Sequence, residues 1–435
     1  MHEHTTDTPQ ALGGLRVLDL SRVLAGPWAT QILGDLGAEV IKVENPARRD
    51  DTRTWGPPFV EGGEQPWDAA YYFCTNRNKQ AIAVDFSREE GAAIIRRLAS
   101  EADVLVENFK VGTLARYGLD YASLRVLNPR LIYCSITGFG QTGPYAKRGG
   151  YDFLIQGMSG LMSITGRESG EPGAGPVKVG LPISDLFCGL YATISILAAV
   201  NHRHARGEGQ YIDCALLDSQ VSLLANQAMN YLVGGQVPQR LGNGHPNVVP
   251  YRDFAAKDDY LLVACGNDGQ FRALCRLLQR GDLADDPRYA SNAGRNRHRR
   301  ELEVSLAHSI ATWPAAELLA AMQREGVPGG PINTVAQVLD DPQVQARGML
   351  QSLQRDDGTT ISVLGYPAKL SLTPASYRQA PPRFGQDTAA LLQERLRLSP
   401  EDIAALMRDG VLGGDARAPR LDAVQALPTA PSSVG

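Results

Sequence analysis

Leu15-Arg-Val-Leu-Asp-Leu20 and Glu39-Val-Ile-Lys-Val-Glu44 decide the fold of this chain. Each is a short, mainly apolar run, which is typical of a strand buried in a parallel sheet. Between them Gly26-Pro27 opens a helix and Gly37 closes it. A strand, a helix and a second strand at this spacing predict a parallel βαβ unit, so the expected fold class is α/β with a doubly wound sheet.

The first turn of that unit, Ser21-Arg-Val-Leu-Ala-Gly-Pro27, lacks the Gly-x-Gly-x-x-Gly pattern of dinucleotide-binding proteins. Glu44 follows Gly26 by 18 residues, where such proteins place a ribose-binding acid. However, Pro27 removes one N–H group that a pyrophosphate would use. A nucleotide-dependent oxidoreductase is therefore a rival hypothesis that the Pro27 turn argues against.

The strand and helix pattern continues along the chain. We expect a helix through Ala99 that Ser87 and Glu90 cap, a helix containing Arg116, and one long helix from Asp218 to about Val233. Further strands are expected at residues 80–85, 104–109 and 131–136, within 207–216, at 260–264 and near Ser362. Residues 51–69 are expected to form a surface loop, and 328–331 a hinge-like return.

The ends of the strands carry the first hints of a site. In open α/β sheets, ligands bind outside the carboxyl ends of the strands. Leu24, Asn108, Thr137 and Asp152 follow such ends, which predicts one shared crevice. The Gly-rich loop at 138–143 could cradle a phosphate or an oxyanion, with a tight surface turn as the equal alternative.

Asp185 opens the most apolar helix of the sequence. The run from Leu186 to Val200 is apolar almost all round, which predicts a central core helix rather than a membrane span. A carboxylate at the first turn of a helix is stabilised by the helix dipole and by free N–H groups. From this stretch alone Asp185 is more simply a helix cap than a catalytic acid.

Composition limits the possible functions. The 435 residues are 43% hydrophobic and 21% charged, with a formal charge of -4, so neither nucleic acid nor a membrane surface is an expected partner. The six cysteines have no paired spacing, and no zinc pattern or other metal motif is present. Because no metal motif is present, we expect no bound metal. The first residues carry no secretory pattern, so we expect a cytoplasmic protein.

Eight motifs in order carry a family resemblance. They are residues 12–27, residues 33–44, Asn76-Arg-Asn-Lys79, Val106-Glu-Asn-Phe109, Gly138-Phe-Gly-Gln-Thr-Gly-Pro144, Gly150-Tyr-Asp152, Ser184-Asp185 and Gly207-Glu-Gly-Gln210. Together they resemble the family III CoA-transferases (the CaiB/BaiF family) over residues 12 to 413. Residues 51–59, 133–137 and 329–333, with His245 and Val249-Pro-Tyr251, make the chain look most like the succinyl-CoA:glutarate (dicarboxylate) subgroup.

The resemblance implies an interlocked homodimer with a Rossmann-like large domain and a smaller α+β domain. The expected bounds are a leader at 1–11, the large domain at 12–234 and 336–413, the small domain at 235–335, and a disordered tail at 414–435. No cofactor is expected to be bound permanently, because CoA and acyl-CoA are the substrates. The expected partners are an acyl-CoA, a carboxylic acid and a second copy of the chain.

The resemblance also makes Asp185 the nucleophile. Its carboxylate would attack the acyl-CoA carbonyl and form a mixed anhydride, which CoA thiolate converts to an aspartyl-CoA thioester. The acceptor acid would then reverse both steps. Arg53, Arg148 and His245 are the hypothesised cations for the far carboxylate of a dicarboxylate. The expected CoA contacts are Leu24, Ala25, Asn45, Val84, Asp85, Phe86, Ser87, Asn108, Phe109, Lys110, Arg116, Gly149, Gly150, Tyr151 and Asp152.

Two details of the resemblance matter for the alternatives. Asn45 stands where some relatives carry Arg, so Arg48 or Arg49 could replace it at a phosphate. An α-methylacyl-CoA racemase is the rival within the family, and such enzymes carry His where this chain has Tyr151. Because the unperturbed pKa of tyrosine is about 10, Tyr151 is a poor base and favours transfer. A non-catalytic binding protein would require Asp185 to be only a cap.

Overall fold

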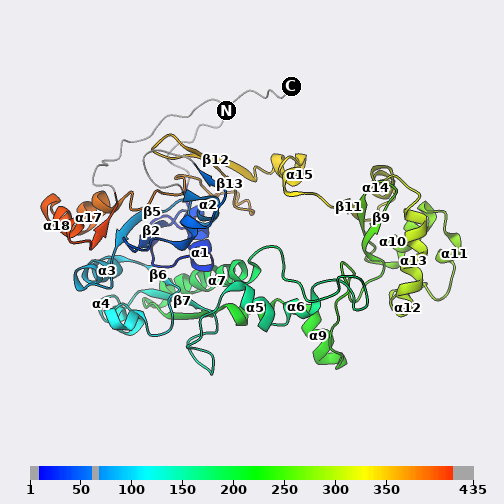
Figure 1. Cartoon of the computed structure of the whole chain (residues 1–435), viewed down its shortest axis with the longest axis horizontal. Coiled ribbons are helices and arrows are strands. Elements are labelled where there is room, and N and C mark those ends of the chain that lie inside the picture. Colours follow the sequence, from blue (N-terminus) through cyan, green and yellow to red (C-terminus); the bar gives the residue numbers. More distant parts are fainter. Residues whose placement is uncertain (1–8, 61–67, 415–435) are drawn as a thin grey trace. The chain divides into compact units, whose positions relative to one another are not determined.

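A computed structural model describes residues 9–60 and 68–414 (Figure 1). Contacts divide the chain into two compact units. The first comprises Met1–Gly150, Asp185–Leu216 and Gln351–Gly435, and the second comprises Tyr151–Ser184 and Leu217–Leu350. The predicted small domain at 235–335 lies within the second unit, and its exact bounds stay a prediction. Most of the expected leader and nearly all of the tail lie outside the described residues.

The first unit is built on a seven-stranded sheet in the order β14-β5-β2-β1-β6-β7-β8. All neighbours from β5 to β8 are parallel, and β14 joins the edge antiparallel to β5. The first strand of the chain, β1, lies at the centre, with β2, β5 and β14 to one side and β6, β7 and β8 to the other, as in a doubly wound fold. The predicted α/β fold with a parallel sheet is confirmed. The strands are β1 (Arg16–Asp19), β2 (Glu39–Glu44), β5 (Gln80–Val84), β6 (Val104–Glu107), β7 (Ile132–Thr137), β8 (Tyr211–Ala215) and β14 (Leu412–Gly413).

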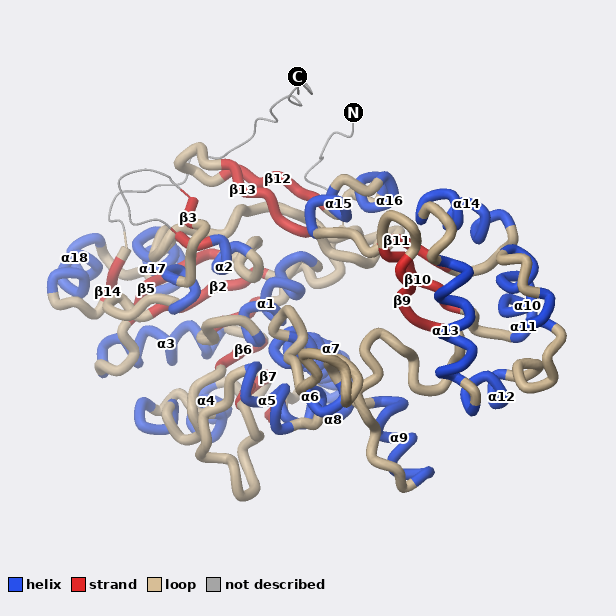
Figure 2. The backbone as a smooth tube through the Cα atoms, turned by 45° about the vertical axis from the view of Figure 1, so that its right-hand side comes forward, coloured by secondary structure: helices blue, strands red, loops and turns tan. Residues whose placement is uncertain are grey.

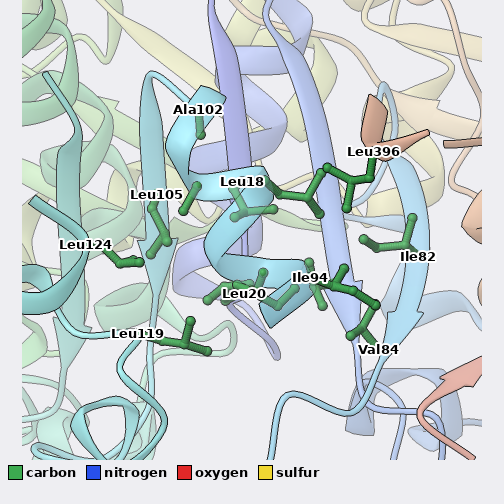
Figure 3. Close-up of a cluster of buried hydrophobic side chains, with 14 of the residues drawn as sticks. Leu18, Leu20, Ile82, Val84, Ile94, Ala102, Leu105, Leu119, Leu124 and Leu396 are labelled. Atoms are coloured by element: carbon green, nitrogen blue, oxygen red, sulfur yellow. The ribbon is translucent and has the colours of Figure 1, made fainter. Parts of the chain in front are cut away.

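Apolar side chains from strands and helices form the core of this unit (Figure 3). Alternate strand residues such as Leu18 and Ile82 meet Ile94 of α3, and all three are 5% exposed or less. Helix α3 buries one face only, whereas α1 is buried almost all round because it packs on β1, β2 and β6. Its helices are α1 (Ala25–Asp35), α2 (Ala70–Phe73), α3 (Glu89–Glu101), α4 (Tyr121–Leu127), α17 (Thr388–Leu396) and α18 (Pro400–Arg408), with short 3-10 helices η1 (Asp51–Thr54) and η2 (Leu114–Tyr117).

Helix α7 (Ile183–Arg206) is longer than expected and is not buried all round. Leu190, Tyr191 and Ile194 are 39%, 40% and 61% exposed, so the predicted fully buried helix is wrong for a single chain. Of the helices among the described residues, α7 alone has the length and apolar composition to cross a membrane, with 44% of its most apolar window buried. A single such helix is weak support for a membrane span, because the core helix of a soluble protein meets the same criterion.

The second unit combines a three-stranded antiparallel sheet with short helices (Figure 2). Its strands are β9 (Tyr251–Ala255), β10 (Tyr260–Ala264) and β11 (Gly329–Pro331). Its own core includes Phe254, Phe271, Leu302 and Leu318. The helices are α5 (Asp152–Met158), α6 (Leu161–Ile164), α8 (Leu216–Ser222), α9 (Ala225–Gly234), α10 (Asp268–Leu277), α11 (Gly281–Ala284), α12 (Asn292–Arg297), α13 (Arg299–Ile310), α14 (Ala315–Arg324), α15 (Val335–Leu339) and α16 (Pro342–Ala346).

Several local expectations were wrong. Helix α3 begins at Glu89 without a side-chain cap, because the Ser87 hydroxyl donates to Asp85 instead. The expected single helix from Asp218 is two helices, α8 and α9, and Ala225 at their junction has a φ of 39°. The hinge-like return at 328–331 contains strand β11, and Arg116 lies on a 3-10 turn.

The described parts of the expected surface loop at 51–69, residues 51–60 and 68–69, contain more regular structure than predicted, and residues 61–67 lie outside the described residues. It holds η1 and a pair of short antiparallel strands, β3 (Phe59–Val60) and β4 (Asp68–Ala69). A further two-stranded sheet, β12 (Leu350–Gln354) with β13 (Thr360–Leu364), confirms the strand expected near Ser362. Thr52 and Arg53 are buried, because the η1 turn packs inward on charged partners.

Candidate active site

The loops after β1 and β6 are joined at the carboxyl edge of the sheet. The side-chain carbonyl of Asn108 accepts the Arg22 N–H at 3.0 Å, and its amide donates to the Arg22 carbonyl at 2.6 Å. These two loops belong to neighbouring strands on either side of the topological switch, where doubly wound folds bind ligands. Asn108 therefore fixes the loop that leads to Leu24 and Ala25 at the start of α1.

Aromatic rings connect the neighbouring loops. Phe86, after β5, meets Phe109 edge-on at 5.5 Å and Tyr117 at 6.0 Å between ring centroids. The Arg22 guanidinium lies 5.7 Å from the Phe109 centroid. The structure thus brings the loops after β1, β5 and β6 together with η2, which carries Arg116. Lys110 and Arg116 are both exposed on this edge, where their charges can meet a phosphate.

Asn45 and Asp85 tie the loops after β2 and β5. The Asn45 amide donates to Asp85 Oδ1 at 3.0 Å, and its carbonyl accepts the N–H groups of Ala47 and Arg48. Asp85 Oδ1 also accepts hydrogen bonds from the backbone N–H and the side-chain hydroxyl of Ser87. Asn45 therefore organises the turn that presents Arg48, which is exposed, as a cation at this edge.

Glu107 is a buried carboxyl that sequence reasoning did not assign to the site. It accepts the Ser135 hydroxyl and, at 2.8 Å, the Phe109 N–H, so it sets the path of the Asn108–Phe109 turn. Burial raises the pKa of Glu107 to about 7, against the effect of both hydrogen bonds. Its position as the last residue of β6 was the available signal, and only the fold shows that the side chain points inward.

The Gly-rich loop at 138–143 is the first part of a longer loop, residues 138–150, whose two ends touch each other. A Cβ on Gly138 would lie 2.6 Å from the Cα of Gly150, so the two ends of the loop touch through bare backbone. The Gln141 N–H already donates to Asp213, and the Gly140 N–H to Thr137. These donors are used within the unit, which favours the tight turn over the phosphate cradle.

Asp185 is half-buried on the first turn of α7, and the position of this turn depends on Gly189. Residues four apart lie on one helix face, so Gly189 is directly below Asp185. A Cβ on Gly189 would lie 2.6 Å from the Ala25 carbonyl oxygen and 3.0 Å from a Trp28 ring carbon. The missing side chain lets α7 touch the first turn of α1, so this face of α7 is turned toward the Leu24–Ala25 turn.

Gly189→Ala is therefore expected to push these helices apart and to lower stability by about 1–3 kcal/mol, a typical cost of overpacking. The obstacle is a backbone atom, which cannot move aside like a side chain. Chemical denaturation of the purified variant measures this loss. Ala404→Gly, at an exposed position of α18, is a control for helix propensity alone. An unchanged free energy of unfolding for Gly189→Ala would contradict the close contact.

The remaining CoA candidates divide between the two units. Gly149 and Gly150 end the closed loop of the first unit, whereas Tyr151 and Asp152 begin α5 in the second. Tyr151 is 69% exposed. Asp152 is engaged, since it accepts the Ser184 N–H at 2.8 Å and the Gln156 amide at 2.7 Å. Its visible role is to hold the chain just before Asp185.

Arg53 does not suit the predicted role in substrate binding. It is 2% exposed, forms two hydrogen bonds with Glu44 and one with Asp68, and stacks 3.7 Å from the centroid of Tyr72. Its charge is already balanced by two carboxylates in the interior. This environment makes Arg53 a structural cation rather than a substrate contact.

Arg148 and His245 differ in their ability to present a positive charge to a substrate carboxylate. Arg148 is exposed, and its guanidinium stacks on Phe139 and Tyr145 at 5.1 and 4.7 Å. His245 Nδ1 accepts the N–H groups of Asn247 and Val248 at 3.1 Å. Burial and the nearby Arg299 guanidinium lower the pKa of His245, so its ring is neutral at pH 7 and offers a hydrogen bond rather than a charge.

Comparison with known proteins gives one consistent result. A succinate–glutarate CoA-transferase of Agrobacterium fabrum is 52% identical over 393 residues, covering 89% of this chain and 97% of that protein. The human succinyl-CoA:glutarate CoA-transferase is 43% identical, covering 92% and 90%. The crystal structure of a CAIB/BAIF family protein from Brucella suis matches with a TM-score of 0.78 at 49% identity, covering 89% of this chain and 99% of that one.

A family-wide comparison agrees with these individual matches. The description "CoA-transferase family III" fits residues 12–388, a span that runs from the strand before α1 to the start of α17. It includes the carboxyl-edge loops and Asp185. The chain therefore belongs to CoA-transferase family III.

Proposed function

We propose that this CoA-transferase moves CoA from succinyl-CoA to glutarate or a similar dicarboxylate, with Asp185 as the nucleophile. The observation that carries the proposal is a half-buried carboxylate on the first turn of α7, on the helix face that Gly189 packs against the start of α1. The names of the similar transferases from Agrobacterium fabrum and human supply the donor and acceptor.

The chemistry follows from the need to conserve the energy of the thioester. Asp185 attacks the succinyl-CoA carbonyl, which breaks the C–S bond, releases CoA thiolate and leaves a mixed anhydride. The thiolate attacks the aspartyl carbonyl, which expels succinate and gives the aspartyl-CoA thioester. A glutarate carboxylate attacks this thioester, which breaks its C–S bond, releases CoA thiolate and forms a second mixed anhydride between glutarate and Asp185. The thiolate then attacks the glutaryl carbonyl of this anhydride, which releases glutaryl-CoA and restores the Asp185 carboxylate.

The helix supports this role physically. The N-terminal end of α7 favours the ionised carboxylate, which is the form that attacks. Apolar α7 residues such as Cys188 and Ile196 are completely buried behind it. Water is the competitor at every step, because it would hydrolyse both the anhydride and the thioester. A dry support below the nucleophile limits that loss.

The carboxyl-edge loops are the proposed CoA site. Arg116, Lys110 and Arg48 are exposed cations for its phosphates, and the turn held by Asn108 lies at the switch of the sheet. Tyr151 is proposed as a substrate contact. Arg148 is our candidate for the far carboxylate, with His245 as a neutral hydrogen-bond donor.

We further propose a homodimer whose chains interlock. The exposed apolar side chains on α7, Leu190, Tyr191 and Ile194, support it, since an apolar stripe of this kind is normally covered. A second copy is the partner that the family resemblance suggests. Light scattering combined with size-exclusion chromatography should give twice the chain mass of 46.9 kDa. A single-chain mass would reject the dimer.

A panel assay tests the activity. Purified protein is mixed with succinyl-CoA and one of several acids, namely glutarate, itaconate, malate or acetate, and the CoA products are resolved by mass. We expect glutaryl-CoA to form faster than acetyl-CoA. Acetate has no second carboxylate that could pair with the proposed cation Arg148. No transfer to any acid, together with α-proton exchange in a branched acyl-CoA, would overturn transfer in favour of racemisation.

A further inference from the structure

Gln220 is a buried amide whose two halves are used differently. It lies on α8 with none of its surface exposed. Its Oε1 accepts the Ser184 hydroxyl at 2.9 Å. Its Nε2 has no hydrogen-bond partner among the residues that the structure describes. One half of the amide therefore holds the residue directly before Asp185, and the other half is an unused donor.

Ser184 is held from a second side as well. Its N–H donates to Asp152 at 2.8 Å, and Asp152 in turn accepts from Gln156. Gln156, which is fully buried, also accepts the Val179 N–H at 2.9 Å. Three polar side chains from α5 and α8 thus fix the segment that leads into α7. The start of this helix is held by a network built around Ser184.

The unpaired donor is costly for the fold. A buried polar group without a partner costs about 1–3 kcal/mol, and a methionine of similar shape would avoid that loss. The Ser184 hydroxyl needs only an acceptor, which glutamate would also provide. Neither the packing nor the bond to Ser184 explains the NH₂ group, so the donor suits an oxygen that is present only during turnover.

We propose that Gln220 positions the nucleophile's turn through Ser184, and that its Nε2 donates a hydrogen bond to an acyl oxygen that reaches this turn during the reaction. The inference rests on the proposed function, because it assumes an acyl group at Asp185. Each tetrahedral intermediate of the transfer carries a negative oxygen that needs an N–H donor. A neutral amide can serve it without forming an ion pair with the free carboxylate, which would weaken the nucleophile.

Three variants separate the anchor from the donor. Gln220→Met removes both, Gln220→Glu keeps an acceptor for Ser184 but loses the donor when ionised, and Ser184→Ala removes only the anchor. We expect Gln220→Met to lower kcat about 100-fold with a small change in KM for succinyl-CoA. Its melting temperature should change little, because the loss of the unpaired donor offsets the loss of the acceptor for the buried Ser184 hydroxyl. Gln236→Met, at an exposed position of the same unit, is the matched control.

The pH profile of Gln220→Glu gives the sharpest result. A protonated glutamic acid can donate through its O–H, whereas a glutamate cannot. We expect the kcat of this variant, relative to wild type, to recover as the pH falls. Ser184→Ala should lose less activity than Gln220→Met, since it keeps the donor.

The outcomes distinguish this inference from the proposed function. If the wild type transfers CoA and Gln220→Met does so equally fast, the inference alone is overturned. The same holds if Gln220→Met loses activity only in step with its melting temperature, or if Ser184→Ala accounts for the whole loss. If the wild type itself transfers no CoA from succinyl-CoA, the proposed function fails first.

Discussion

Asp185→Asn should lower CoA transfer at least about 10³-fold, because removing an attacking group typically costs this much or more. The amide keeps the shape of the side chain and can still interact with the first turn of α7, but it cannot form an anhydride or a thioester. The measurement is the rate of glutaryl-CoA formation from succinyl-CoA, followed by mass. Hydroxylamine added during turnover should modify Asp185 in the wild type and leave the variant unmodified.

A matched control separates chemistry from capping. Asp218 lies in the first turn of α8 and is exposed, so Asp218→Asn also removes an acid from the start of a helix. We expect it to retain near-normal transfer. If Asp185→Asn kept a tenth or more of the wild-type rate, and hydroxylamine found no target, Asp185 would be a cap. The nucleophile would then have to be sought elsewhere.

The sequence predicted the parallel sheet well, because the signal for it is local. Each strand is a short apolar run bounded by turn residues, and the crossovers between strands are long enough for helices. The order of motifs also placed the carboxyl-edge residues Leu24, Asn45 and Asn108 on adjacent loops. These features depend on neighbours in the chain, which a sequence shows directly.

Features that depend on distant partners could not be predicted. Ser87 and Glu90 fit a capping box, yet Ser87 bonds to Asp85 once the β5 turn forms. His245 looked like a cation because nothing nearby in sequence reveals that burial and the charge of Arg299 lower its pKa. The same limit applies to Gln220, which lies 36 residues after its partner Ser184.

The exposed face of α7 shows a different limit. An all-round apolar pattern indicates that a helix is covered, but it does not say by what. In a single chain Ile194 remains 61% exposed, so the pattern and the fold agree only if another surface packs there. The sequence predicts a covered helix, whereas the single chain leaves this face of α7 exposed.

Arg53→Met is expected to lower the free energy of unfolding by about 3–5 kcal/mol, the usual cost of breaking a buried ion pair from one side. Glu44 would lose two hydrogen bonds and its only cation in direct contact among the described residues, while buried at 4% exposure. Asp68 would keep Arg355, which bonds to its other oxygen at 2.8 Å. The unpaired charge on Glu44 therefore dominates the loss. Urea denaturation followed by circular dichroism measures it.

Two companion variants make this prediction specific. Glu44→Gln combined with Arg53→Met should recover part of the stability, since the double change leaves no lone buried charge at this pair. Arg148→Met should change stability by less than about 0.5 kcal/mol, as is usual at an exposed position, while raising the KM for glutarate. If instead Arg53→Met unfolded like the wild type and raised that KM, Arg53 would be the substrate cation that its loop position first suggested. The buried contacts with Glu44 and Tyr72 argue for the opposite result. If the Arg53 guanidinium moved away to bind substrate, the Glu44 carboxylate would be left buried without its ion-pair partner.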